Sequence, residues 1–475
     1  MPRVLPPLAV ALTCLVGASA CDDARGPGLD EYAVALDLPP TTTDKIDVLF
    51  VIDNSGSMRD NLSEVAEQAK TALVDVLSYA LGTPDLHLGV ITSDMGALGT
   101  PSNGCGGLGD AGALMNRPRY LGQGSQPTCA GLADDARFLV DRTDADGAHA
   151  TNYDGELVDA LGCMVSQGGD GCGFEQPFAA IAAAIDPDHP INADFLRDDA
   201  ILAVVLLTDE DDCSAADPAL YGDDPGLGPK DSFRCFQYAV ACDGDDPDPG
   251  VAGAPGPRSG CELRPEPRYH TPVQALVDQL VARKGGDPSR IIVASFDGGV
   301  GPVVVDTYPA GDGTDTTWLT LAPSCGAPNT APGGAPRTAA PALRLAALRD
   351  AFPGRAWSES ICGDLGAGLE RTAEVVADVA GARPCLRGAL RDADATTPGI
   401  QPTCRAVAVH SLDGGELTTA VPACAGDAAT GCFALVADAD ACPGSDSGLR
   451  VELRGVAVDD AHLVVSCLPP ALAAP

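Results

Sequence analysis

An apolar run that ends in a polar cluster is the feature that most constrains this chain. Residues 48–52 read Val-Leu-Phe-Val-Ile, and the sequence Asp-Asn-Ser-Gly-Ser follows at once. Five consecutive apolar residues predict a strand that is buried on both faces, as in a parallel sheet covered by helices. We therefore expect Asp53, Ser55 and Ser57 at the carboxyl end of a central strand, where open α/β sheets bind ligands.

These three side chains form a set of hard oxygen ligands. One carboxylate and two hydroxyls suit Mg²⁺, which prefers octahedral oxygen coordination and keeps waters when few carboxylates bind it. Such a set leaves the charge of the ion incompletely neutralised. We therefore predict a divalent cation with an open coordination position that attracts a carboxylate from a partner.

The same residues carry a family resemblance. Asp53-Asn54-Ser55-Gly56-Ser57 resembles the D-x-S-x-S motif of the metal-ion-dependent adhesion site in von Willebrand factor A (VWA) domains, and the apolar strand before it is similar to that family as well. The resemblance implies an α/β fold with a doubly wound, mostly parallel sheet, and it implies that Asp53, Ser55 and Ser57 bind the metal.

Asp209 is the fourth candidate ligand. Residues 200–207 are the most apolar strand of the chain, and Thr208-Asp209 follows it. The carboxyl end of this strand is expected beside that of the first, which brings Asp209 near Asp53. In the VWA family the corresponding Asp holds the metal, often through water. For the next three residues, 210–212, we expect a solvated acidic loop.

Asp170 is the fifth candidate. The resemblance places a third metal-site residue, usually Thr, in a glycine-rich loop, and this chain has Asp170 in that loop. Three alternatives stay open: Asp170 binds the ion directly, binds it through water, or does not bind it. An acid at this position favours Ca²⁺ or Mn²⁺ more than the usual ligand set does.

Hydrophobic periodicity predicts the other elements. Helices are expected over residues 62–81, 156–165, 174–185, 273–283, 343–351 and 365–379. Further strands are expected at residues 86–92, 291–296, 303–307 and 356–358. Strand, helix and strand in succession imply right-handed parallel crossovers.

The predicted domain organisation has four parts. Residues 1–20 read as a secretory signal peptide, 21–43 as a lipidated cysteine with a flexible tether, 44–381 as the VWA domain, and 382–475 as a small cysteine-rich β module. The VWA domain carries Pro/Gly-rich insertions at 93–153 and 213–268. Both leave from the carboxyl ends of strands, so we expect them to overhang the metal face and to select the partner.

Export is the expected destination of the chain. Ala-Ser-Ala before Cys21 resembles a bacterial lipobox, in which the cysteine is lipidated, although Ala-x-Ala also suits ordinary cleavage. The chain is therefore expected either in the bacterial cell envelope, anchored by lipid in the outer membrane or periplasm, or secreted. Membrane contact is expected only through this anchor.

Disulfides are the expected state of the remaining cysteines. Removing Cys14 with the signal and assigning Cys21 to lipid leaves an even number of the 18 cysteines, without zinc-site spacing. We expect bridges between Cys105 and Cys129, between Cys163 and Cys172, and between Cys325 and Cys362. The connectivity stays open for four others: Cys213, Cys235, Cys242 and Cys261.

Binding is the predicted function. The formal charge of −38 argues against nucleic acid and anionic membrane surfaces as direct partners. We predict an adhesion-type protein that uses Mg²⁺, or Ca²⁺ or Mn²⁺, to bind an acidic group of a partner protein or glycan. One alternative is an envelope scaffold with a degenerate, metal-free VWA domain.

A metal-dependent hydrolase is the other alternative, and the expectation is that the chain is not an enzyme. An aspartyl phosphatase arrangement needs a second Asp where Ser55 stands. A serine nucleophile lacks the G-x-S-x-G turn, and the six histidines show no paired spacing.

Overall fold

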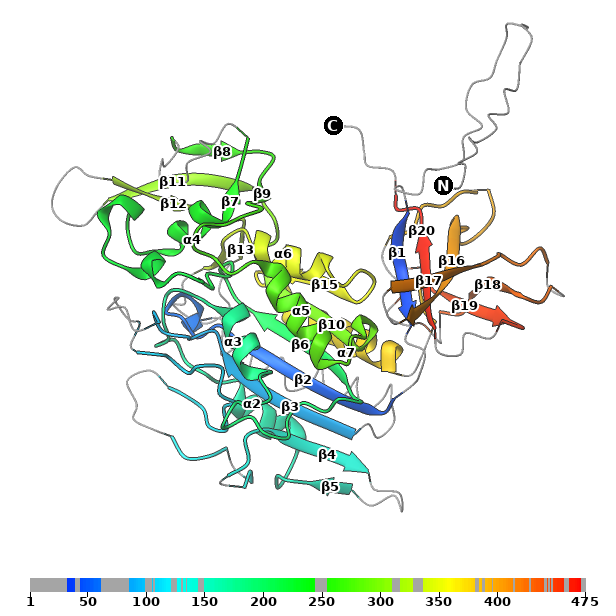
Figure 1. Ribbon diagram of the computed structural model, residues 1–475, viewed down its shortest axis with the longest axis horizontal. Helices are drawn as coiled ribbons and strands as arrows, with labels where there is room; N and C mark the ends of the chain where they lie inside the picture. The colour runs from blue at the N-terminus through cyan, green and yellow to red at the C-terminus, as the bar shows by residue number, and fades with distance from the viewer. Residues whose placement is uncertain are drawn as a thin grey trace, which may run out of the picture.

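The computed structural model is an α/β protein built around one seven-stranded sheet (Figure 1). It describes the chain except residues 1–31, 39–42, 61–84, 99–104, 106, 121–125, 130, 134, 144–148, 244–253, 310–316, 328–335, 381–383, 387–388, 395, 413–414, 427–428, 440–441, 443–444, 446, 457–460 and 471–475. The predicted signal peptide, the lipidated Cys21 and the predicted helix over 62–81 lie outside the described residues.

The central sheet is mixed and mostly parallel, as the sequence predicts. Its strand order is β15-β10-β6-β2-β3-β4-β5. The strands span β2 (Lys45–Ile52), β3 (Asp85–Thr92), β4 (Leu139–Thr143), β5 (His149–Thr151), β6 (Ile201–Leu207), β10 (Ile291–Asp297) and β15 (Ala356–Ser360). The first five in the order are parallel, whereas β4 and β5 pair antiparallel at one edge. The predicted insertion at 93–153 therefore also extends the sheet.

Helices cover both faces of this sheet. Helices α2 (Leu157–Met164) and α7 (Leu365–Ala380) pack on one face. Helices α3 (Pro177–Ala184), α5 (Val273–Arg283) and α6 (Leu343–Asp350) pack on the other. Strand β2 requires helices on both faces of the sheet because its apolar side chains alternate. Val48 and Phe50 point into the first core, and Leu49 and Val51 point into the second. Each such buried side chain contributes about 1.5–3 kcal/mol to stability.

Smaller elements surround the carboxyl edge of the sheet. They are α4 (Ser232–Ala239), the strands β7 (Val240–Ala241), β8 (Gly256–Arg258), β9 (Glu262–Leu263), β11 (Val303–Pro309), β12 (Thr317–Leu321), β13 (Cys325–Ala327) and β14 (Arg337–Ala339), and the 3₁₀ turns η2 (Ser57–Asp60), η3 (Pro218–Tyr221) and η4 (Pro225–Leu227). The 3₁₀ turn η5 (Pro288–Arg290) instead lies at the amino end of β10. Strand β11 pairs with β12 and β8 in a separate antiparallel sheet.

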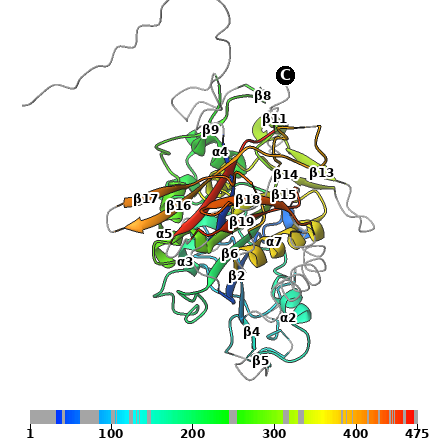
Figure 2. The ribbon, with the colours of Figure 1, turned by 90° about the vertical axis from the view of Figure 1, so that its right-hand side faces the viewer.

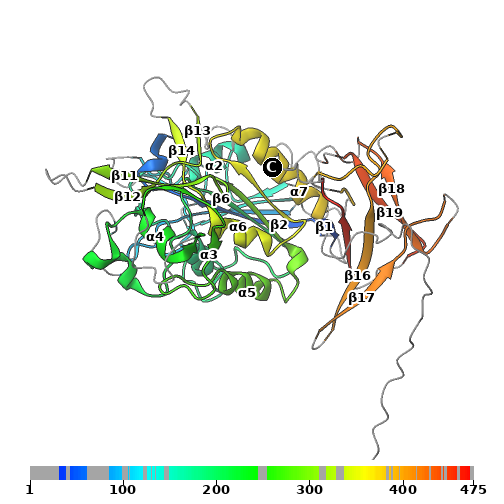
Figure 3. The same ribbon diagram turned by 90° about the horizontal axis from the view of Figure 1, so that it is seen from above.

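The C-terminal residues form a β module with its own core (Figures 2 and 3). One sheet has the order β1-β20-β16-β17, and β18 pairs with β19. These strands are β1 (Ala33–Leu38), β16 (Cys404–Leu412), β17 (Gly415–Val421), β18 (Cys432–Ala437), β19 (Leu449–Arg454) and β20 (His462–Cys467). The prediction of a flexible tether over 21–43 is wrong for residues 33–38, because they complete the edge of this sheet.

Eight disulfides join the described residues. The pairs are Cys105–Cys172, Cys129–Cys163, Cys213–Cys235, Cys242–Cys261, Cys325–Cys362, Cys385–Cys442, Cys404–Cys467 and Cys424–Cys432. The prediction for Cys325 and Cys362 is confirmed. The predicted bridges Cys105–Cys129 and Cys163–Cys172 are wrong, because each of these cysteines joins the 105–129 segment to the 163–172 segment.

This number of disulfides is typical of an extracellular or otherwise oxidising environment. Within the described part of the chain, no helix has both the length and the apolar character needed to cross a membrane.

Candidate metal centre

The site lies where the two most apolar strands end. Strands β2 and β6 are parallel neighbours with Ile52 opposite Leu207, so the residues that follow emerge together. The backbone N–H of Asp53 donates to the carbonyl of Leu207 over 2.9 Å, which fixes the two ends to each other. The chain runs from β2 to β3 on one side and then to β6 on the other. This is the switch point at which open α/β sheets bind ligands.

Asp53 is held in a single orientation at this point. It is 1% exposed. Its Oδ1 accepts a hydrogen bond from the backbone N–H of Ser55 over 2.8 Å, and its Oδ2 accepts one from the Thr208 hydroxyl, also over 2.8 Å. Thr208 was not among the predicted site residues, although its position directly after β6 is a signal that could have identified it.

A chain of hydroxyls connects the two predicted acids. The Oγ atoms of Ser55 and Ser57 lie 2.9 Å apart, and the Ser57 hydroxyl donates to Oδ1 of Asp209 over 3.1 Å. The carboxyl groups of Asp53 and Asp209 lie near each other, close enough that the charge of Asp53 acts on Asp209. The structure thus brings together four of the five predicted residues, from two strands that are far apart in the sequence.

Two further acids stand beside this group, and sequence reasoning missed both as site residues. Glu175 is 2% exposed, and its carboxyl group lies beside that of Glu210. Glu175 also feels the charges of Asp53 and Asp209. The signal in the sequence that could have pointed to Glu175 is its place directly before Gln176-Pro177. Proline favours the first turn of a helix, and Pro177 here begins α3.

Burial raises the pKa of every acid in this group, and repulsion from neighbouring carboxylates adds to it for Asp209, Glu175 and Glu210. Burial is the largest cause for Asp53, and the pKa of its carboxyl is raised. Burial followed by the charge of Asp53 raises the pKa of Asp209 to about 9. Burial raises the pKa of Glu210 to about 7, and burial with the charge of Glu210 raises that of Glu175 well above its usual range. The folded chain therefore disfavours the ionised forms of these four carboxyl groups, and a positive charge among them would reverse this.

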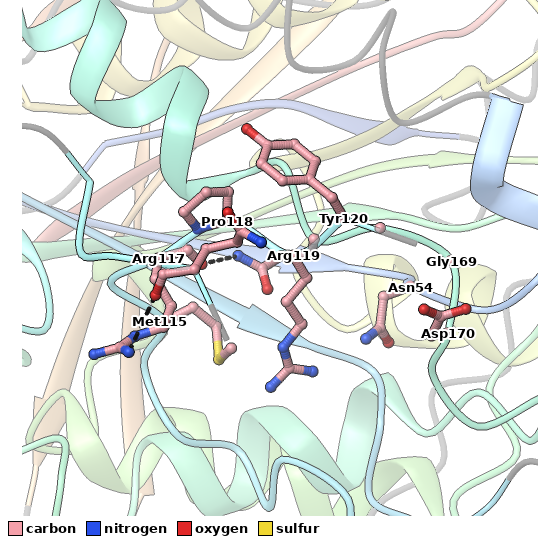
Figure 4. A pocket seen from close by; sticks show the side chains of 11 residues that line it. Asn54, Met115, Arg117, Pro118, Arg119, Tyr120, Gly169 and Asp170 are labelled. Carbon is pink, nitrogen blue, oxygen red and sulfur yellow. Dashed lines mark hydrogen bonds between the residues drawn. The ribbon is translucent and has the colours of Figure 1, made fainter. Parts of the chain in front are cut away.

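Asp170 lies elsewhere along the same edge. Its side chain is exposed and lines a cavity together with Asn54 (Figure 4). The backbone N–H of Gly171 donates to the carbonyl of Asn54 over 2.8 Å, so the glycine-rich loop does contact the motif. Among the described interactions, none joins the Asp170 carboxylate to the group around Asp53.

The expectation of a solvated loop over 210–212 is wrong. Asp212 is 1% exposed and accepts hydrogen bonds from the Arg344 guanidinium, over 2.9 Å, and from the backbone N–H of Phe178. Asp211 accepts the backbone N–H groups of Arg344 and Leu345 at the start of α6. Burial nonetheless raises the pKa of Asp211 to about 6. Hydrogen bonds from other residues of the chain thus hold the carboxylates of Asp211 and Asp212.

Disulfide-linked segments pack beside the site, on the side of Glu175. Phe174, next to Glu175, packs in a satellite core with residues of both predicted insertions, among them Cys105 and Tyr221. Beneath this core, Glu175 and Glu210 line a cavity of about 10 Å³, enough for about one water molecule.

One other group has the ligand types of a metal site. Cys213, Cys235 and His270 lie close together and are buried. Because the two cysteines form a disulfide, neither offers a thiolate to an ion. The oxygen-rich group around Asp53 is therefore the better candidate among the described residues.

Comparison with known proteins adds no assignment. No family model matches the chain, and no characterised protein matches it in sequence. The function of the site is accordingly argued from its residues and their geometry.

Proposed function

We propose that this chain is an exported binding protein of the cell envelope, in which Asp53, Ser55, Ser57 and Asp209 hold a divalent cation in the manner of the VWA adhesion site. A bound cation supplies the positive charge that an acidic group of a partner protein or glycan requires. The observation that carries the proposal is the uncompensated group of buried carboxylates at the switch point of the sheet.

The chemistry of the donors supports a hard cation. Two carboxylates and two hydroxyls lie close to one another, and all are oxygen ligands of the kind that Mg²⁺, Ca²⁺ and Mn²⁺ prefer. Within the described residues, no Lys or Arg forms an ion pair with Asp53, Asp209, Glu175 or Glu210. Buried charges are normally paired or coordinate a metal, so a cation from solution fits this position.

Glu175 takes the role that the resemblance suggested for Asp170. Glu175 is buried and lies close to both proposed ligands, whereas Asp170 is exposed. A carboxylate in place of the neutral threonine of the VWA family increases the negative charge of the site. We therefore expect Ca²⁺ or Mn²⁺ to compete well with Mg²⁺ here.

Calorimetric titration of Mg²⁺, Ca²⁺ and Mn²⁺ into the folded protein tests the proposal without knowledge of the partner. We expect one ion per chain, loss of binding in Asp53→Asn and Asp209→Asn, and weaker binding in Glu175→Gln. The matched control is Asp170→Ala, which should bind the ion as the wild type does. Wild-type protein that takes up no ion at millimolar concentration would contradict the proposal.

A metal-free scaffold is the second candidate, and one observation favours it. The pKa values of Asp53, Asp209, Glu175 and Glu210 are all raised, so protons alone can neutralise the carboxyl groups of the site. On this alternative the same titration shows no ion uptake, and Asp209→Asn behaves as the wild type towards every cation.

A further inference from the structure

The β module has an open strand edge at β17 (Gly415–Val421). This strand pairs with β16 and with no other strand in the part of the chain that the structure describes. With seven residues it is the longest of the described edge strands. Figures 2 and 3 show the β16–β17 hairpin extending beyond the other strands of the module, and residues 417–420 are all exposed.

Three residues of β17 direct their backbone groups towards this open edge. The N–H of Leu468 donates to the carbonyl of Thr403, which fixes the alternation of hydrogen bonds between β20 and β16. Carried across β16, the alternation leaves Glu416, Thr418 and Ala420 with N–H and C=O groups that point away from β16. Among the described residues, these groups form no other backbone hydrogen bond. Such a row of unpaired groups is a template for another strand.

Edge strands of native proteins usually carry a feature that prevents pairing, and β17 lacks the common ones. It contains no Lys and no Pro, and its register with β16 runs without a bulge. The opposite edge of the same sheet differs, because the register of β1 shifts between Val34 and Leu36. Residues 417–421 read Leu-Thr-Thr-Ala-Val, a composition that favours a strand. We therefore expect β17 to have a partner strand.

The distribution of charge favours a second copy of the same strand as that partner. The chain has a net charge of −38, yet residues 404–421 contain one Arg against one Asp and one Glu, a net charge of −1. Depletion of charge is typical of the core of protein interfaces. Two such hairpins can approach each other without strong repulsion, whereas a basic partner would be attracted to the acidic remainder of the chain.

The open edge is also complementary to itself. An antiparallel pair with a two-fold axis at Thr418 places Thr418 opposite Thr418 of the second copy and Glu416 opposite Ala420. All three outward residues then have hydrogen-bonding partners, and the two copies of Glu416 do not face each other. On the other face of the strand, Leu417 is 54% exposed and comes to lie beside Thr419 of the second copy.

We propose that β17 pairs with β17 of a second copy of the chain, which joins two four-stranded sheets into one continuous sheet. The strand contact is small beside the standard protein interface of about 1,600 Å², so the dimer dissociates on dilution. Pairing requires no cation. A dimer also presents two metal centres to one partner, and this consequence alone rests on the proposed function.

Analytical ultracentrifugation of the folded protein, from low to high micromolar concentration, tests the proposal in Mg²⁺ and in chelator. We expect the same monomer–dimer equilibrium in both buffers. Thr418→Pro removes an outward N–H donor from each copy, and Thr418→Lys places like charges on the axis. Each should raise the dissociation constant of the dimer about tenfold or more. Proline is tolerated on an edge strand where the N–H faces solvent, so the monomer should stay folded, and Thr418→Val is the matched control that keeps the dimer.

A mixture of two variants identifies the partner strand. Thr418→Lys mixed with Thr418→Glu should restore the dimer, because opposite charges then meet on the axis. The proposal is overturned if the wild type stays monomeric at every concentration, if Thr418→Pro and Thr418→Lys dimerise as the wild type does, or if the mixture stays monomeric. Dimers that form only in Mg²⁺ would place the contact at the metal centre and would also overturn it. Failure of the cation titration, in contrast, leaves this proposal standing.

Discussion

A buried aspartate lies near each end of strand β2, and the two differ in the charge of the groups that surround them. Near the amino end, Asp47 is fully buried and accepts hydrogen bonds from the backbone and Nε of Arg197, with Nζ of Lys284 at 3.5 Å. At the carboxyl end, Asp53 is almost as buried, but its neighbours are hydroxyls and further acids. Only the five residues 48–52 of strand β2 separate a neutralised carboxylate from an uncompensated one.

The comparison shows that this fold can neutralise a buried acid where it needs to. At the carboxyl edge itself, Asp212 pairs with Arg344 and Asp297 with Arg349. Among the described residues, the lack of a basic partner around Asp53 is therefore a local feature of the site. We interpret it as the requirement for a positive charge that these residues do not supply.

The largest expected effect is loss of stability when a paired acid is neutralised. Asp47→Asn removes the ion-pair partner of the buried Lys284, and Asp212→Asn removes that of the buried Arg344, so each should lower the free energy of unfolding by about 3–5 kcal/mol. Urea denaturation measures this loss, which should be the same with and without Mg²⁺. A loss below about 1 kcal/mol in both variants would break the comparison.

The second expected effect is a pH dependence of stability. It comes from Lys284, which lies beside Asp47 at the amino end of β2. Burial lowers the pKa of Lys284 to about 8 in the folded chain, against an ordinary value of 10.5. The unfolded chain therefore binds more protons between these values, and stability should rise with pH from about 8 to 10.5, by on the order of 2–3 kcal/mol. Unfolding of the wild type and of Lys284→Met across this range measures the difference. Parallel pH profiles would count against the assignment.

The third effect is a gain of stability at the uncompensated end. Asp209→Asn keeps an acceptor for Ser57 and removes a carboxyl group whose pKa of about 9 in the folded chain makes folding take up a proton at neutral pH, which costs stability. Without divalent cations this variant should be more stable than the wild type by about 1 kcal/mol or more. Millimolar Mg²⁺ should then stabilise the wild type, by about 2.7 kcal/mol at 100 times the dissociation constant, and leave the variant unchanged. Thermal unfolding measures both, and a destabilised variant in chelator would contradict the prediction.

The sequence predicted the central sheet well because its strands are continuous apolar runs. The runs before Asp53 and Thr208 can only be buried parallel strands, and parallel neighbours bring their carboxyl ends together. Local pattern was thus enough to place Asp53, Ser55, Ser57 and Asp209 in one group.

The remaining errors all involve partners that are distant in the sequence. Asp212 looks solvated because its counter-ion, Arg344, comes 132 residues later. Residues 33–38 look like a tether because they pair with β20 near the far end of the chain. The cysteine pairs likewise depend on how two segments fold against each other. No hydrophobic pattern in the sequence marks Glu175, so only the fold shows that it belongs to the site.

The most direct test of the central claim is an anomalous difference map from crystals grown with Mn²⁺. The account predicts a strong peak between Asp53, Ser55, Ser57 and Asp209, with their oxygens turned towards it. A map without a peak there would contradict it.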